Sequence, residues 1–241
     1  MLLIYNFFTL LFAVFISLFL ITGIFLIIRA IYLRKLNVFY IGIAYILIGF
    51  GFIGNLVFKL GIIFEEIFVS LGFSFVALFT YTTFYKNRNN IAKYFLTGVL
   101  SLLFVHFILK VFFSIQPDEL IHIIRKIFDV IGTFSTFAWM GLSSLLAYQR
   151  IKDENIQQWI KTRYKLFSYS ALLLSVQAIP ELFLPYNVSY GDPDLNAVLI
   201  FGFTLILSLI FSIGFLFAWI IPKQLKKINN KLISIWNRRK N

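Results

Sequence analysis

The residues best suited to chemistry are a few polar side chains inside long apolar stretches, and Asp129 is the clearest of them. It is a single carboxylate near the start of the apolar stretch 127–148. His122 and Arg125 precede it by two turns and one turn on the same face of a helix. The small and hydroxyl residues that follow on this face are Thr133, Thr136, Ser143, Ser144 and Ala147. Such a face is costly against lipid, so we expect 127–148 to be the central helix of a membrane bundle.

A wider set of polar residues falls near the same end of the neighbouring apolar stretches. The candidate pocket residues are Asn55, Lys59, His106, Lys110, Arg125, Asp129, Gln177 and Glu181. Ionisable side chains inside membrane segments mark ligand, ion or proton sites, so this set predicts a polar pocket near the outer face. Pro180 predicts a bend beside Glu181. The alternative is structural: the same groups form ion pairs that hold the helices in register.

The residue types argue against enzymatic, metal and haem chemistry. The chain has 2 histidines, His106 and His122, and no cysteine. No nucleophile stands beside a base, and no histidine triad or clustered carboxylate pair occurs in the apolar stretches. A satisfied polar histidine fits this pattern better than an axial haem ligand or a metal ligand. We therefore expect no enzyme activity, no metal and no cofactor.

Composition places these residues in a membrane protein. Of 241 residues, 60% are hydrophobic and only 13% are charged, which is more apolar surface than a soluble domain of this size can bury. The net charge of +12 is divided among short basic clusters between apolar runs. That distribution is typical of membrane topology, and it argues against nucleic acid as a partner. The expected partner is the lipid bilayer, with the protein located in the cell membrane as a multi-pass protein.

The apolar stretches predict an all-α polytopic bundle of seven transmembrane helices. The expected spans are 2–28, 38–58, 67–85, 94–114, 127–148, 166–183 and 195–221. These spans make one domain, 1–222, followed by a tail, 223–241. We expect 152–165, the most polar stretch between spans, and 185–194, rich in turn-forming residues, to be loops. Pro222 should end or kink the seventh helix.

The charges between the spans predict one orientation. Carboxylates other than Asp153 and Glu154 fall on one side of the bundle. The lysines and arginines on that side are only Lys59, Lys110, Arg125 and Lys126, out of 22 in the chain. The positive-inside rule then places the N-terminus outside and the C-terminus in the cytoplasm.

The tail predicts a short basic amphipathic helix on the membrane surface. Its apolar residues recur at helical spacing, and they are Leu225, Ile228, Leu232 and Ile235. The basic residues around them are Lys226, Lys227, Lys231, Arg238 and Arg239. Such a helix binds the anionic lipids of the inner leaflet. The alternative is a basic stop signal without regular structure.

These patterns favour a receptor or sensor whose ligand enters from outside and whose basic inner face contacts a cytoplasmic signalling partner. A transporter for a small solute or ion is the first alternative, and a structural or assembly subunit is the second. Polar residues in the inner half of the spans are mainly hydroxyls: Thr80, Thr82, Thr83, Ser143 and Ser144. A transporter needs polar groups along its whole path, so this asymmetry favours a pocket closed on the inner side.

Overall fold

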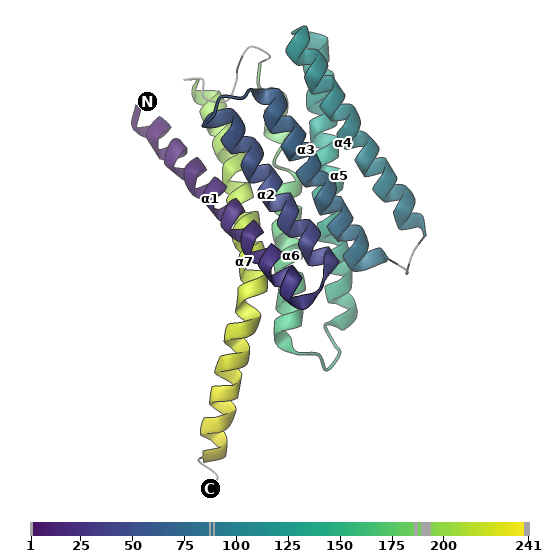
Figure 1. The fold of residues 1–241 in the computed structure, drawn as a ribbon, viewed down its shortest axis with the longest axis vertical. Helices are drawn as coiled ribbons and strands as arrows, with labels where there is room; N and C mark the ends of the chain where they lie inside the picture. Colours follow the sequence, from purple (N-terminus) through teal and green to yellow (C-terminus); the bar gives the residue numbers. More distant parts are fainter. Residues whose placement is uncertain (1, 87, 89, 186–187, 189–193, 239–241) are drawn as a thin grey trace.

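The computed structural model describes residues 2–86, 88, 90–185, 188 and 194–238, with side chains described from residue 9 to residue 219 within those ranges. The described chain is helical and contains no strand. The seven main helices are α1 (Leu2–Leu33), α2 (Leu36–Leu56), α3 (Ile62–Thr80), α4 (Ile91–Ile115), α5 (Glu119–Ile151), α6 (Gln158–Ser175) and α7 (Leu195–Arg238) (Figure 1). All seven are long and apolar enough to cross a membrane, which confirms the predicted class.

Successive helices run up and down as antiparallel neighbours, and α1 also packs against α7 (Figure 1). We call the end at which the chain begins, where α2 joins α3 and α4 joins α5, the N-terminal end of the bundle. The opposite end, where α1 joins α2 and α5 joins α6, is the C-terminal end. The orientation of these ends across a membrane stays a prediction.

The central position of α5 is confirmed. It packs against α3, α4, α6 and two short helical turns, and it is the longest helix in the bundle after α7. The predicted polar face points inward, with Thr133, Thr136, Ser143 and Ser144 all buried. The helix begins well before residue 127 because Asp118 caps it: its carboxylate accepts hydrogen bonds from the backbone N–H groups of Leu120 (2.9 Å) and Ile121 (3.1 Å).

Two further helices also start well before the predicted residue. α3 begins at Ile62 rather than residue 67, directly after Gly61, whose φ of 92° is open to glycine at no steric cost. α6 begins at Gln158, so the prediction of a loop over 152–165 is wrong for its second half. The polar residues of that turn are compatible with a helix because Arg163 donates a hydrogen bond to a neighbouring helix, from Nε to the carbonyl of Ala218 at 3.1 Å.

Two short irregular turns complete the helices. The last turn of the third span, Tyr81–Tyr85, is a π-helix. α6 ends at Ser175, and a 3₁₀ turn over Ile179–Phe183 contains Pro180, where the sequence predicts a bend. Proline has no N–H to continue the α-helical ladder, and the segment that contains Pro180 and Glu181 is a 3₁₀ turn instead of α-helix.

Pro222 does not end the last helix. α7 runs from Leu195 to Arg238, so the tail continues this helix beyond the bundle instead of starting a separate one (Figure 1). The tail side chains, those of Lys226, Lys227, Lys231 and Arg238 included, and the whole of Arg239 lie outside what the structure describes. Their predicted contact with the membrane surface therefore stays a prediction.

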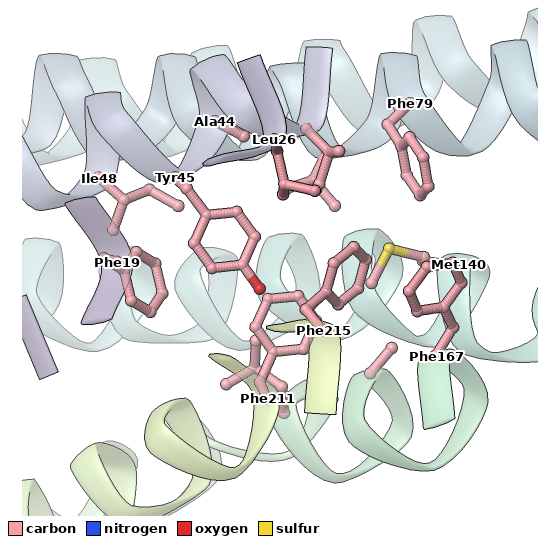
Figure 2. Close-up of a cluster of buried hydrophobic side chains, with 14 of the residues drawn as sticks. Phe19, Leu26, Ala44, Tyr45, Ile48, Phe79, Met140, Phe167, Phe211 and Phe215 are labelled. Atoms are coloured by element: carbon pink, nitrogen blue, oxygen red, sulfur yellow. The ribbon is translucent and has the colours of Figure 1, made fainter. Parts of the chain in front are cut away.

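The centre of the bundle is filled by aromatic side chains from most of the helices (Figure 2). Tyr45 of α2 stacks on Phe211 of α7 with 5.8 Å between ring centroids and 2° between ring planes. Phe167 of α6 stacks on Phe215 at 4.4 Å. These rings are almost completely buried, and Phe215 follows Phe211, a residue of the cavity described below, by one turn of α7.

Candidate functional site

A cavity of about 120 Å³ lies in the N-terminal half of the bundle. Its polar lining comes from α3, α4, α5, α7 and the turn after α6: Glu65, Glu66, Ser70, His106, Lys110, Asp129, Thr133, Gln177, Glu181, Thr204 and Ser208. Its apolar lining includes Phe137 and Phe211, which also belong to the aromatic core. The cavity therefore reaches from the charged helix ends down to that core.

Glu66 is the most heavily contacted carboxylate in the cavity. It is 3% exposed, and it forms an ion pair with Lys110 of α4. Its other oxygen, Oε1, accepts a hydrogen bond from Ser70 Oγ at 2.8 Å and lies 3.3 Å from His106 Nδ1. The carboxylate thus joins α3 to α4 and satisfies a lysine inside the membrane segment.

His106 and Asp129 face each other without a hydrogen bond. His106 Nε2 lies 3.9 Å from Asp129 Oδ1, and this buried nitrogen has no hydrogen-bond partner among the described residues. In a neutral ring whose Nδ1–H points to Glu66, Nε2 carries a lone pair. Two acceptors then meet across a gap, and a cation or a hydrogen-bond donor between them stabilises both. Thr133 Oγ1 donates a long hydrogen bond, 3.4 Å, to the same Asp129 oxygen.

Other polar groups of the lining are paired. Lys126 Nζ donates to Glu181 Oε2 at 2.8 Å, and both side chains are largely buried. Asn55 Nδ2 donates to Glu65 Oε2 at 2.6 Å. On the far wall, Gln177 accepts two hydrogen bonds from α7, from Ser208 Oγ at 2.8 Å and from Thr204 Oγ1 at 3.1 Å. Against these satisfied groups, the gap between His106 and Asp129 stands out.

The hydroxyls of the inner half do not extend the cavity. Tyr85 and Ser143 share a hydrogen bond of 2.8 Å, and Asn37 Nδ2 donates to Thr83 Oγ1 at 3.1 Å. Thr80 donates to a carbonyl of its own helix. These side chains are paired locally, whereas Ser144 Oγ is buried without a hydrogen-bond partner among the described residues, and none of them lines the cavity. Phe137 and Phe211 line the cavity and pack against each other, and Phe211 in turn packs against Tyr45 and Phe215 of the aromatic core (Figure 2).

Comparison with known proteins gives no relative on which to base a function. No family model, no curated protein and no solved structure matches the chain. The function must therefore be inferred from the chemistry of the site.

Most of the predicted pocket residues lie together. Those that line the cavity are His106, Lys110, Asp129, Gln177 and Glu181. Asn55 contacts the cavity through Glu65. Lys59 is exposed in the turn between α2 and α3, with φ of 53°, and does not line the cavity.

Arg125 is buried but lies beside the cavity rather than in its wall. Its Nη2 is 3.1 Å from His122 Nδ1, and its guanidinium stacks on Phe113 at 4.5 Å. These contacts replace the ion pair with Asp129 that their one-turn spacing favours. Asp129 thus has the imidazole of His106, rather than an arginine, as its nearest partner among the described ion-pair contacts.

The sequence prediction left Glu65 and Glu66 out of the pocket residues, because both fall in the predicted turn before the third helix. The sequence feature that could have indicated them is Gly61. A glycine in a turn just before an apolar run is compatible with a helix that starts directly after it, before the predicted residue 67. With the start at Ile62, Glu66 falls on the same face as Ser70 and Phe73, which also line the cavity.

The cavity does not arrange its side chains as a metal centre. Across the described residues, no three histidine or carboxylate side chains form a group that could hold a metal ion. The reason is visible at His106, whose two ring nitrogens face different carboxylates. Because each carboxylate faces a different ring nitrogen, Glu66, Asp129 and His106 do not point their ligand atoms at one common position, as ligands of a single metal ion would.

Proposed function

We propose that this chain is a non-enzymatic seven-helix membrane receptor or sensor that binds a small cation in the cavity. The observation that carries the proposal is the gap between His106 Nε2 and Asp129 Oδ1, two acceptors 3.9 Å apart with no donor between them among the described residues. The charge of the lining supports it. The described lining carries carboxylates from Glu65, Glu66, Asp129 and Glu181, against the one lysine Lys110.

The size of the cavity supports a small ligand. A volume of about 120 Å³ holds on the order of ten water-sized groups, since one such group needs roughly 10–15 Å³. An inorganic monovalent cation, ammonium or a small primary amine fits this space together with several waters. A drug-sized ligand does not, because such ligands occupy pockets of about 300 Å³ or more.

The aromatic lining supports sensing over transport. A transported ion needs polar or hydrated contacts along its whole path, whereas the lining of this cavity includes the packed aromatic rings of Phe137 and Phe211. In the proposed orientation, the polar N-terminal end faces outside and the basic C-terminal end faces the cytoplasm. The cell membrane, a cytoplasmic signalling partner for the basic end and anionic lipids around the tail belong to the same proposal.

The first test is cation-dependent stability of the purified protein. We expect sodium, potassium, ammonium or methylammonium chloride to raise the melting temperature above that in N-methylglucamine chloride, whose cation is too large for the cavity. Asp129→Asn should fold, because Asp129 has no directly paired lysine or arginine among the described residues, and should lose this response. Asp153→Asn, at an exposed site by the C-terminal end, is the matched control and should keep it. Equal melting temperatures of the wild-type protein in all of these salts would rule out the cation proposal.

An ion or small-solute transporter is the second candidate, favoured by one observation: ionisable groups on three helices meet inside the bundle, as they do in proton and ion pathways. Flux through the protein in liposomes separates the two. The receptor proposal expects a cation that raises the melting temperature but is not carried across the membrane. Cation flux through the wild-type protein that is abolished in Asp129→Asn would support the transporter and contradict the receptor proposal. A purely structural subunit would show neither binding nor flux.

A further inference from the structure

Two arginines meet over one tryptophan at the C-terminal end of the bundle. Arg29 of α1 lies 4.9 Å from the ring centre of Trp219, and Arg163 of α6 lies 4.4 Å from it. Arg163 also stacks on Trp159 at 4.9 Å. Three helices, α1, α6 and α7, therefore bring two guanidinium groups to one place.

Pro222 explains why the arginines are held there. Proline lacks the N–H that would bond to the carbonyl four residues earlier, which is that of Ala218. Arg163 Nε donates to this carbonyl at 3.1 Å, and Arg29 Nη1 donates to the next one, of Trp219, at 2.6 Å. Neighbouring side chains often satisfy such carbonyls in membrane helices. The arginines thus stabilise the continuous α7, and their positions are fixed by it.

The two carbonyls use only a few of the hydrogen-bond donors of the arginines. Each guanidinium carries five N–H donors, and each forms one hydrogen bond with the described residues. Among those residues, no carboxylate lies within ion-pair distance of Arg29 or Arg163. Trp219 Nε1, a further donor, is buried without an acceptor there. Two neighbouring positive charges and their spare donors are therefore uncompensated within the part of the chain that carries described side chains.

We infer that Arg29 and Arg163 form a binding site for a phosphate group at this end of the bundle. Phosphate matches the planar fork of arginine donors, and an anion relieves the repulsion between the two charges. Both side chains are only partly buried, so an anion can reach them. Arg29 lies near the end of the span Thr9–Leu33, and Trp219, over whose ring it lies, comes shortly before the basic residues that begin at Lys223, which is the depth of lipid headgroups. The phosphate is supplied by an anionic lipid or by a free phosphate ion.

The test measures binding of dioleoyl phosphatidic acid, dioleoyl phosphatidylcholine and inorganic phosphate to the full-length protein in a neutral detergent. Native mass spectrometry counts retained lipid, and the melting temperature reports inorganic phosphate. The informative variant is Arg29→Gln with Arg163→Gln, because glutamine keeps an N–H donor for the carbonyls but removes the charge. The matched control is Arg34→Gln with Arg150→Gln, two exposed arginines at the same end with the same change in net charge.

The wild-type protein and the control should bind phosphatidic acid in preference to phosphatidylcholine. The double variant should lose about tenfold or more in affinity for phosphatidic acid, as expected for the loss of charge-assisted hydrogen bonds. If inorganic phosphate raises the melting temperature of the wild-type protein but not that of the double variant, the site is assigned to the free ion. Equal retention by wild-type protein and double variant, or an equal loss in the control, overturns the inference.

A second variant keeps the inference testable should the first one fail to fold. Arg29→Lys with Arg163→Lys retains both charges and loses the planar fork of donors. Weaker binding of phosphatidic acid or inorganic phosphate by this variant supports the site. Unchanged binding of both phosphate sources by the folded variant counts against an arginine-specific site.

Discussion

At the scale of single residues, the pairing of Glu66 with Lys110 explains how these two charges can be buried inside the bundle. Both side chains are largely buried, and each is the principal partner of the other. An isolated charge in such a place is far more costly than a paired one, so the pair acts as one neutral unit. Asp129 differs because its nearest partner among the described ion-pair contacts is the imidazole of His106, at a distance longer than a hydrogen bond, and no lysine or arginine pairs with it there.

This difference predicts that two similar substitutions, Glu66→Gln and Asp129→Asn, lower the stability by different amounts. Glu66→Gln should lower the free energy of unfolding by about 3–5 kcal/mol, because it leaves the Lys110 charge buried and unpaired. Glu66→Gln combined with Lys110→Met should recover most of that loss. Asp129→Asn should have a much smaller effect. Unfolding in a graded mixture of detergents, followed by circular dichroism, measures all three, and equal losses for Glu66→Gln and Asp129→Asn would contradict this account.

The residues of the site were only partly predictable from the sequence. His106, Lys110 and Asp129 are conspicuous because a polar residue in the middle of an apolar stretch is costly unless it has a buried partner or a ligand. Glu66 is not conspicuous, since it lies next to Glu65 at the edge of a span and resembles a turn. Arg125 shows the opposite error: its one-turn spacing from Asp129 favours an ion pair, whereas its guanidinium stacks on a phenylalanine. Helical spacing fixes the face of a side chain and leaves its rotamer to the neighbouring helices.

At the scale of elements, α1 and α2 approach each other closely through glycine. A Cβ atom on Gly42 would lie 3.0 Å from the backbone nitrogen of Ile27 and 3.2 Å from the carbonyl oxygen of Gly23. The backbones of two helices meet in this way only where one of them has no side chain. Gly98, on the exposed side of α4, has no atom within 4 Å of the corresponding position among the described residues and serves as the matched control.

We expect Gly42→Ala to destabilise the protein by about 1–3 kcal/mol, because backbone atoms cannot move aside for the added methyl group. Gly98→Ala should be neutral or stabilising by up to about 1 kcal/mol, since alanine lowers the entropy of the unfolded chain. Melting temperatures in one detergent compare the two variants directly. An equal rise in melting temperature for Gly42→Ala and Gly98→Ala would show that helix propensity, and not the close approach, governs both sites.

Helix number was predictable at this scale, and helix ends were less so. Seven apolar runs of bilayer length have one simple interpretation. The start of α6 was missed because Lys161 and Arg163 resemble loop residues, and a helix end at the membrane interface accepts such residues when a neighbouring carbonyl takes their donors. Pro222 should end or kink α7 because it removes a hydrogen bond, yet α7 passes through it because Arg163 of α6 supplies the missing donor. The linear sequence does not reveal that contact.

At the scale of the whole molecule, the two ends of the bundle differ in charge, and this difference predicts the orientation. The chain has no cysteine, so single cysteines report accessibility without a background. Gln116 and Asn155 are both exposed and lie in turns at opposite ends. Gln116 is preferable to Asp118, because Asp118 caps α5.

A cysteine at Gln116 should react with a membrane-impermeant thiol reagent in intact cells, and one at Asn155 should react only after the cells are opened. Cysteines at Asn187 and Asn89, which lie outside the described residues, should behave like Gln116 and Asn155, respectively. The measurement is the fraction of protein labelled before and after permeabilisation. Labelling of Asn155 in intact cells together with protection of Gln116 would invert the orientation and move the cavity to the cytoplasmic side.

The pairing of Glu66 with Lys110 also bears on how the chain enters the membrane as it is made. Glu66 lies near the start of α3 and Lys110 near the end of α4, so the two charges face each other across one helical hairpin. A lysine at membrane depth raises the insertion free energy of a lone helix by about 2.5–3.5 kcal/mol. When α3 and α4 insert together, each charge meets its partner before α5 has been synthesised. The order of synthesis thus provides charge compensation early, and the carboxylate of Asp129 arrives in a bundle whose lysine is already neutralised.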